Sequence, residues 1–84
     1  SSAASDVYKR QKVRQLQRQL NRIAQNYPAI PKIDVDGIYG PKTVEAVRTF
    51  QNIFDLPKTG VTDYATWYEI SNIYVGVTRI AEPV

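Results

Sequence analysis

The stretch DGIYGPKTVEAVRTFQ, residues 36–51, combines a glycine-rich loop with the start of an amphipathic helix. Gly37 and Gly40 stand where a tight loop needs positive φ or a close backbone approach, which a residue with a Cβ tolerates poorly. Pro41 suits the first helical position, because a helix start leaves that N–H without a partner anyway. The stretch therefore predicts a loop that leads directly into a helix.

Apolar residues recur every three or four positions in three segments, which places them on one face of each predicted helix. The helices are expected over residues 13–27, 41–54 and from a cap at Thr62 or Asp63 to residue 77. Their apolar faces consist of Val13, Leu16, Leu20, Ile23, Ala24 and Tyr27, then Val44, Val47, Phe50 and Phe54, then Trp67, Ile70, Ile73, Tyr74 and Val77. This pattern predicts an all-α fold, a small three-helix bundle.

The loop and the helix after it occur twice. With a shift of 23 residues, a glycine, an apolar residue, a threonine and a second apolar residue coincide. The matching residues are Gly37, Ile38, Thr43 and Val47 in the first copy and Gly60, Val61, Thr66 and Ile70 in the second. We therefore expect a pseudo-repeated loop-helix unit.

The 84 residues suffice for one small domain and not for two. Residues 1–12 are interpreted as a flexible or partly helical lead-in, 13–77 as the three-helix domain, and 78–84 as a C-terminal tail. Between the first two helices, prolines and the pair Ile30 and Ile33 predict an extended, partly tucked connector. Because the chain opens on Ser1 and contains no methionine, we expect an excised domain of a larger protein.

The composition excludes most catalytic and metal-binding designs. The chain has no cysteine and no histidine, which removes disulfides, zinc-thiolate sites, histidine-ligated zinc and the usual general base. The run Asp34 to Gly37 does not fit a calcium loop in either register. A bundle of this size leaves little room to enclose a sugar chain between two carboxylates. No catalytic residue, metal or cofactor is expected, and no run approaches the ~20 apolar residues of a membrane span.

The net charge of +3 is unevenly distributed. A basic stripe of arginines spaced by four lies on a separate face of the first helix: Arg14, Arg18 and Arg22. This stripe can attract anionic partners. More often, such a run of charges is simply the solvent-exposed face of a helix. A basic three-helix domain also suits nucleic-acid binding, but the low overall charge makes the phosphate-neutralising surface thin. A protein-interaction domain is the other alternative.

Five motifs follow one another in order: LQxxLN at 16–21, DGIYGPKT at 36–43, AVRTFQ at 46–51, LPxTG at 56–60 and ATW at 65–67. In this order and spacing the chain resembles the three-helix peptidoglycan-binding domain found beside bacterial cell-wall hydrolases. The resemblance covers roughly residues 13–74. The chain departs from the family pattern in its longer, proline-rich connector and in the apolar helical spacing that continues through Tyr74 and Val77.

The resemblance implies a non-catalytic, extracellular or wall-associated carbohydrate-binding module. Such a module holds peptidoglycan glycan strands or stem peptides in a shallow groove and concentrates an attached enzyme there. By direct match to the family, the ligand-binding positions are Asp36, Gly37, Ile38, Tyr39, Gly40, Thr43, Gln51 and Leu56.

Four of these positions, and Trp67 outside the set, also have a structural interpretation. Asp36 before a glycine in a turn usually bonds its own backbone. Tyr39 can stack on a sugar face from a loop tip with a solvated hydroxyl, or lie at the edge of the core. Gln51 can bind a peptide amide or tie the Asp36 loop to the second helix. The spacing of the apolar residues places Leu56 in the core. For Trp67, a place in the core is favoured over a role as a surface on which a carbohydrate stacks.

Overall fold

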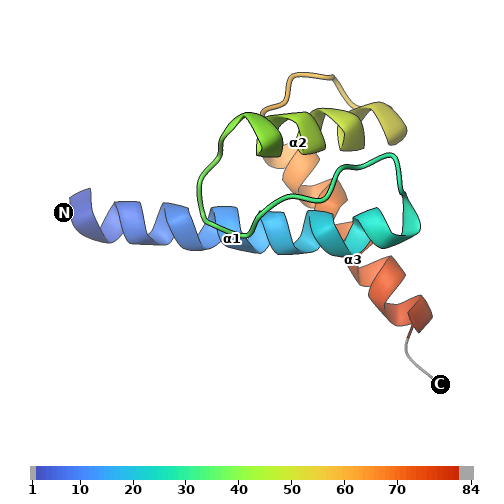
Figure 1. Cartoon of the computed structure of the whole chain (residues 1–84), viewed down its shortest axis with the longest axis horizontal. Helices are drawn as coiled ribbons and strands as arrows, with labels where there is room; N and C mark the ends of the chain where they lie inside the picture. The colour runs from blue at the N-terminus through green and yellow to red at the C-terminus, as the bar shows by residue number, and fades with distance from the viewer. Residues whose placement is uncertain (1, 82–84) are drawn as a thin grey trace.

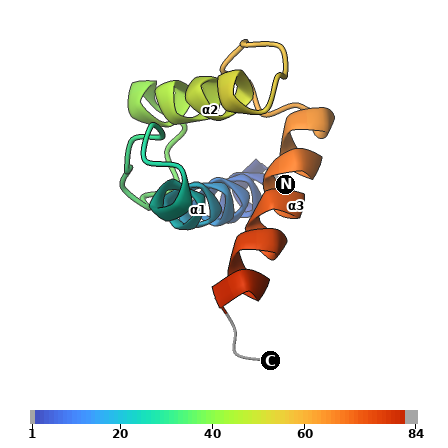
Figure 2. The same cartoon turned by 90° about the vertical axis from the view of Figure 1, so that its right-hand side faces the viewer.

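The computed structural model describes residues 2–81 and contains, within this range, three α-helices and no strand. The helices are α1 (Ser2–Asn26), α2 (Pro41–Ile53) and α3 (Tyr64–Ala81). α1 packs against both other helices. α2 lies over it, and α3 runs from the level of α2 past α1 to the opposite side (Figures 1 and 2). The predicted all-α, three-helix bundle is confirmed.

The helix bounds follow the proline and cap signals in the chain. α1 ends at Asn26, two residues before Pro28, because proline disfavours helical geometry in the residue before it. At its other end α1 reaches back to Ser2, so the described part of the lead-in is helical, and its first turns project beyond the other helices (Figure 1). α3 continues to Ala81; Ser1 and residues 82–84 of the predicted tail lie outside the described residues.

One hydrophobic core joins the three helices and the connector between α1 and α2. The fully or almost fully buried apolar residues are Leu16, Leu20, Ile23, Ile30, Ile33, Ala46, Val47, Phe50, Ile70 and Val77. Ile30 and Ile33 come from the connector, which confirms that it is tucked against the bundle. Asn21 holds it there, since its Nδ2 donates to Ile33 O (2.7 Å) and its Oδ1 accepts from Ile33 N (2.9 Å).

Two of the loop glycines have a left-handed backbone, which the sequence predicts for Gly37. Gly37 has φ 77° and Gly60 has φ 75°. At Gly60 an added Cβ would also lie 2.7 Å from Cγ1 of Val44. A side chain there is therefore disfavoured both by the positive φ and by this clash. The expectation for Gly40 is wrong: its φ of −97° and ψ of −171° are extended, and a Cβ there would meet its nearest atom only at 3.9 Å.

The starts of α2 and α3 differ in their capping. Asp63 caps α3, because its Oδ1 accepts a hydrogen bond from Thr66 N (2.9 Å) and its backbone oxygen accepts one from Trp67 N (2.8 Å). This decides between the two predicted caps, Thr62 and Asp63. α2 starts with Pro41 after Gly40 and has no side-chain cap. None of the helices in residues 2–81 is both long and apolar enough to cross a membrane.

Candidate functional site

A buried glutamine of α1, Gln17, fixes the first loop, residues 36–40. Its Oε1 accepts hydrogen bonds from the backbone N–H groups of Asp36 (3.0 Å) and Gly37 (2.9 Å). Its Nε2 donates to Ile38 O (3.0 Å) and to Thr43 Oγ1 (3.1 Å) at the start of α2. Loop, α1 and α2 therefore share one buried polar centre, which holds the loop in a single shape.

Gln51 of α2 does the same for the second loop, residues 59–63. Its Oε1 accepts from Gly60 N (2.9 Å), and its Nε2 donates to Val61 O (3.0 Å) and Thr66 Oγ1 (3.1 Å). The predicted bridge from Gln51 to the Asp36 loop is therefore wrong, since its partners belong to the other loop and to α3. The side chain is fully buried, so it supports a loop rather than offering atoms to the surface.

Gln17 was not singled out from the sequence, although a signal for it exists. Leu16-Gln17 and Phe50-Gln51 are the same apolar-glutamine pair, and each precedes one of the two glycine loops. The separations differ, because Gln17 lies 20 residues before Gly37 whereas Gln51 lies 9 residues before Gly60. The long connector hides this part of the repeat from a fixed-shift comparison.

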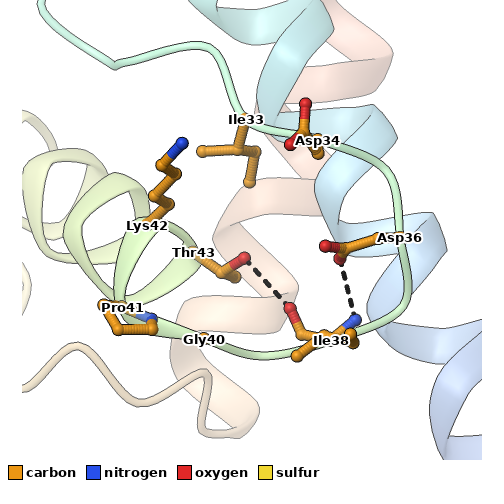
Figure 3. Close-up of a pocket in the computed structure, with 8 residues that line it drawn as sticks. All are labelled: Ile33, Asp34, Asp36, Ile38, Gly40, Pro41, Lys42 and Thr43. Atoms are coloured by element: carbon orange, nitrogen blue, oxygen red, sulfur yellow. Dashed lines mark hydrogen bonds between the residues drawn. The ribbon is translucent and has the colours of Figure 1, made fainter.

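The first loop and the start of α2 border a hollow of ≈ 340 Å³, drawn in Figure 3. It is lined by Ile33, Asp34, Asp36, Ile38, Gly40, Pro41, Lys42 and Thr43. Asp36, Ile38, Gly40 and Thr43 belong to the predicted ligand-binding set, so the structure brings these four together at one open surface.

The other predicted site residues lie elsewhere. The Tyr39 hydroxyl donates to Gly60 O (2.6 Å) and lies 2.9 Å from Thr62 Oγ1, so it joins the two loops and is not the solvated hydroxyl of a loop tip. Burial raises the pKa of this hydroxyl. Gly37 faces Arg10 of α1, and Leu56 packs against the core.

Four residues that line the hollow are not in the set predicted from the sequence: Ile33, Asp34, Pro41 and Lys42. Pro41 and Lys42 lie inside the loop-helix motif, so proximity in the chain was a usable signal for them. Ile33 and Asp34 come from the connector and reach the hollow only because Asn21 holds the backbone of Ile33 against α1.

The hollow carries charges of both signs beside apolar surface. Figure 3 shows the Lys42 side chain on one side and the Asp34 and Asp36 carboxylates on the other, with Ile33 and Thr43 between them. At the rim, the Ile38 side chain is 62% exposed, whereas its backbone N–H and oxygen are bonded to Asp36 Oδ1 (2.9 Å) and to Gln17. This arrangement suits a ligand with an apolar part and both acidic and basic groups.

Two loop carboxylates make the stability of the fold depend on pH. The Ile38 N–H, then the Gln17 amide and more weakly Arg14, lower the pKa of Asp36, and Thr66 lowers that of Asp63. Both carboxyls bind protons less readily in the folded chain than in the unfolded one. Their stabilising effect is therefore present above the ordinary value of 3.8 and is lost as pH falls through the lowered pKa values.

We therefore expect the thermal unfolding midpoint to fall between pH 7 and pH 3, and to fall less in Asp36→Asn. Asparagine keeps an oxygen that accepts from Ile38 N–H but carries no titrating proton. Circular dichroism melts of both proteins at the two pH values measure the difference. Identical pH dependence in wild type and Asp36→Asn would show that Asp36 does not contribute.

A family model described as a putative peptidoglycan binding domain matches residues 9–70, which include both loops and every residue that lines the hollow. Comparisons with curated proteins and with solved structures found no match.

Proposed function

The chain belongs to the family of putative peptidoglycan-binding domains, and from this premise we propose that it holds peptidoglycan in the hollow between the first loop and α2. The module itself carries out no chemistry. Its place is in a wall-associated protein outside the cell membrane, where it keeps an attached enzyme, such as a hydrolase, close to its polymer.

The exposed side chain of Ile38 is the main observation that supports binding of peptidoglycan at the hollow. Its backbone bonds fix the loop, yet its large apolar side chain stands in solvent, next to the charges of the hollow. An apolar side chain that borders a hollow with a few convergent polar groups is placed to contact a ligand in it. A stem peptide of peptidoglycan matches it, because such peptides carry apolar side chains together with free amino and carboxyl groups. Lys42 then pairs with a carboxylate, and Asp34 and Asp36 pair with an amine.

The basic stripe on α1 gives little support to the nucleic-acid alternative. Arg22 is occupied within the fold, since its Nη2 donates to Val77 O (3.2 Å) of α3 and its Nη1 donates to Asn26 Oδ1 (2.9 Å). One member of the stripe thus serves to join α1 to α3. The phosphate-binding surface is correspondingly smaller than the sequence suggests.

The proposal predicts that Ile38→Ser weakens binding to insoluble, nucleic-acid-free sacculi by about tenfold, since the apolar contact of a large side chain is lost. The pseudo-repeat supplies a matched control. Val61 is the equivalent residue of the second loop, is exposed to nearly the same extent (60% against 62%), and does not line the hollow. Val61→Ser should bind as the wild type does in a quantitative pull-down.

Two results of this pull-down, and one of a parallel assay on duplex DNA, would contradict the proposal. Wild-type protein that stays in the supernatant at low salt shows that this chain does not bind the wall. Equal binding by wild type and Ile38→Ser shows that the contact with peptidoglycan does not lie at the hollow. Retention on duplex DNA that falls steeply with salt, without sacculus binding, favours the nucleic-acid alternative. A purified stem peptide should release the bound protein, and failure to do so excludes the peptide as the part recognised.

A further inference from the structure

The outer face of α3 carries an exposed and largely apolar stripe. Its residues recur every three or four positions and therefore share one side of the helix: Tyr64, Tyr68, Asn72, Val75 and Arg79. Tyr64 is 84% exposed, Tyr68 58% and Val75 45%. Figure 2 shows α3 at one side of the bundle, with no other helix or loop of residues 2–81 beyond it. Within that range, nothing covers the stripe.

Both faces of α3 are poor in charge. Its inner face contributes Ile70 and Val77 to the core. A helix that packs on one side normally presents charged and polar residues on the other. Between Tyr64 and Thr78, however, the sequence contains one charged residue, Glu69, and it does not share the spacing of the stripe. Apolar residues on two opposite faces indicate that a second partner packs against the outer one.

The two tyrosines of the stripe are ordered before any partner binds. Their rings are stacked, with 6.4 Å between the centroids and 20° between the planes. Side chains that already pack on each other lose little conformational entropy when they are covered. Tyr64 and Tyr68 therefore offer a preformed aromatic surface, which suits an apolar side chain or the guanidinium of an arginine.

Gly76, beside the stripe, leaves room for another backbone. A Cβ at this position would meet no atom of the described residues within 4 Å, apart from its chain neighbours and the backbone of its own helix. Glycine destabilises the interior of a helix relative to alanine. Its position in α3 has no explanation in the packing of this chain, whereas a close approach by a second helix would make use of it.

The stripe is complementary to itself when two copies of α3 run antiparallel. In such a pair, a twofold axis next to Asn72 brings Val75 of each copy against Tyr68 of the other. The same axis brings Arg79 of each copy against Tyr64 of the other, because the two members of each pair lie equally far from it along the helix. Each apolar or aromatic residue of the stripe thus has a fitting counterpart in the second copy.

The charges favour this direction over the parallel one. In the antiparallel pair, the Arg79 cation of one copy lies near the Tyr64 ring of the other and near the carboxylate of Asp63, which caps the same end of α3. A parallel pair would place the two Arg79 side chains together and align the two helix dipoles. The charge pattern therefore identifies a second, antiparallel copy as the occupant of this face.

We propose that two copies of this chain associate through the outer faces of α3, with Tyr64, Tyr68 and Val75 in the shared interface and Arg79 against Tyr64 of the other copy. The stripe spans about 22 Å of helix. A single pair of helices buries less than the ~1,200–2,000 Å² of a stable complex, so the dimer is weak. We expect monomers at about 10 µM and a substantial fraction of dimers at about 1 mM.

This interface leaves the hollow beside the first loop open, since no residue that lines the hollow belongs to α3. A dimer therefore presents two hollows at once. On a polymer with repeated sites, the second binding event gains from the high effective concentration that the first creates. That consequence depends on the function proposed above, whereas the self-association does not.

Sedimentation equilibrium of the full chain tests the association. Between about 10 µM and about 1 mM, the average mass should rise from that of the 9.5 kDa monomer toward twice this value. Val75→Glu introduces a charge into the interface and should raise the Kd of the dimer at least about tenfold. It should not disturb the fold, because the new carboxylate stands four residues before Arg79 on an exposed face. Val35→Glu, at a connector residue that is 40% exposed, is the matched control and should associate as the wild type does.

Single cysteines test the direction of the pair, since the chain has none of its own. Asn72→Cys places a thiol next to the twofold axis and should give disulfide-linked dimers on oxidation. Val75→Cys should give none, because the two thiols are separated by about 10 Å along the helices, beyond the reach of a disulfide. A parallel pair would be linked by Val75→Cys.

The possible results decide the proposal without affecting the sacculus assay of Ile38→Ser. A mass of 9.5 kDa at every concentration overturns the self-association and shows that another molecule covers this face. Equal association by wild type and Val75→Glu, or an equal loss in Val35→Glu, shows that the contact lies elsewhere. Disulfide-linked dimers of Val75→Cys overturn the antiparallel arrangement. If circular dichroism shows that Val75→Glu has lost helix, Arg79→Glu replaces it, and full association of that variant overturns the proposed contact with Tyr64.

Discussion

Replacing Phe50 by alanine is expected to lower the free energy of unfolding by about 3–5 kcal/mol, the usual cost of truncating a buried aromatic residue. Phe50 is completely buried. Its ring lies 4.5 Å from that of Phe54, and the Phe54 ring lies 5.1 Å from that of Tyr27, which follows α1 directly; both distances are between ring centroids. Removal of Phe50 leaves a void where α2 meets this aromatic cluster. Because small domains are stable by only ~5–15 kcal/mol, the loss is a large part of the total.

Urea unfolding followed by far-UV circular dichroism measures this change, with Tyr64→Ala as the control. Tyr64 is also aromatic but is 84% exposed, and its ring stacks with the neighbouring ring of Tyr68, with 6.4 Å between the centroids. We expect Tyr64→Ala to change the free energy of unfolding by no more than about 0.5 kcal/mol. Similar losses in the two variants would contradict the placement of Phe50 at the centre of the core.

The second large effect is expected from Gln51→Leu, which should cost at least about 2 kcal/mol although leucine fits the volume of glutamine. The substitution leaves the buried N–H of Gly60 and the buried hydroxyl of Thr66 without their glutamine partner. The oxygen of Val61 keeps the longer bond from Thr59 Oγ1 (3.4 Å). Each buried polar group that loses its hydrogen bond costs ~1–3 kcal/mol. The second loop then loses the centre that holds it against α2 and α3.

Gln17→Leu is the internal comparison for this prediction, because Gln17 makes the same kind of bonds to the first loop. Its bonds to the loop are partly buried and its bond to Thr43 is buried, whereas Gln51 makes two buried bonds, from Gly60 N and to Thr66. Gln17→Leu should therefore destabilise less than Gln51→Leu in the same urea assay. Equal losses, or a larger loss from Gln17→Leu, would contradict the explanation by burial.

Much of the fold was predictable from the chain. The helical phase of Leu16, Val47 and Ile70 identified the buried faces, because a helix repeats every 3.6 residues whatever it packs against. Gly37 and Gly60 marked the two loops, because only glycine adopts positive φ at little cost. The family resemblance followed from the same motifs and is confirmed by the family match over residues 9–70.

The candidate site was predictable only in part. The loop-helix motif located Asp36, Ile38, Gly40 and Thr43, since residues close in the chain stay close in a short loop. The same motif could not tell that Tyr39 bonds to the second loop, or that Gln51 is directed to that loop as well. These facts depend on partners elsewhere in the chain, and local propensity carries no information about them.

What the sequence determined by itself was therefore local: three amphipathic helices, two glycine loops and membership in the family of putative peptidoglycan-binding domains. Only the tertiary structure decided how the first loop divides its residues between the hollow and the contact with the second loop. That division depends on hydrogen bonds between residues far apart in the chain, from Asn21 to Ile33 (12 residues), from Gln17 to Gly37 (20) and from Tyr39 to Gly60 (21). Such bonds form only once the helices have packed, because packing brings their donors and acceptors within reach of one another.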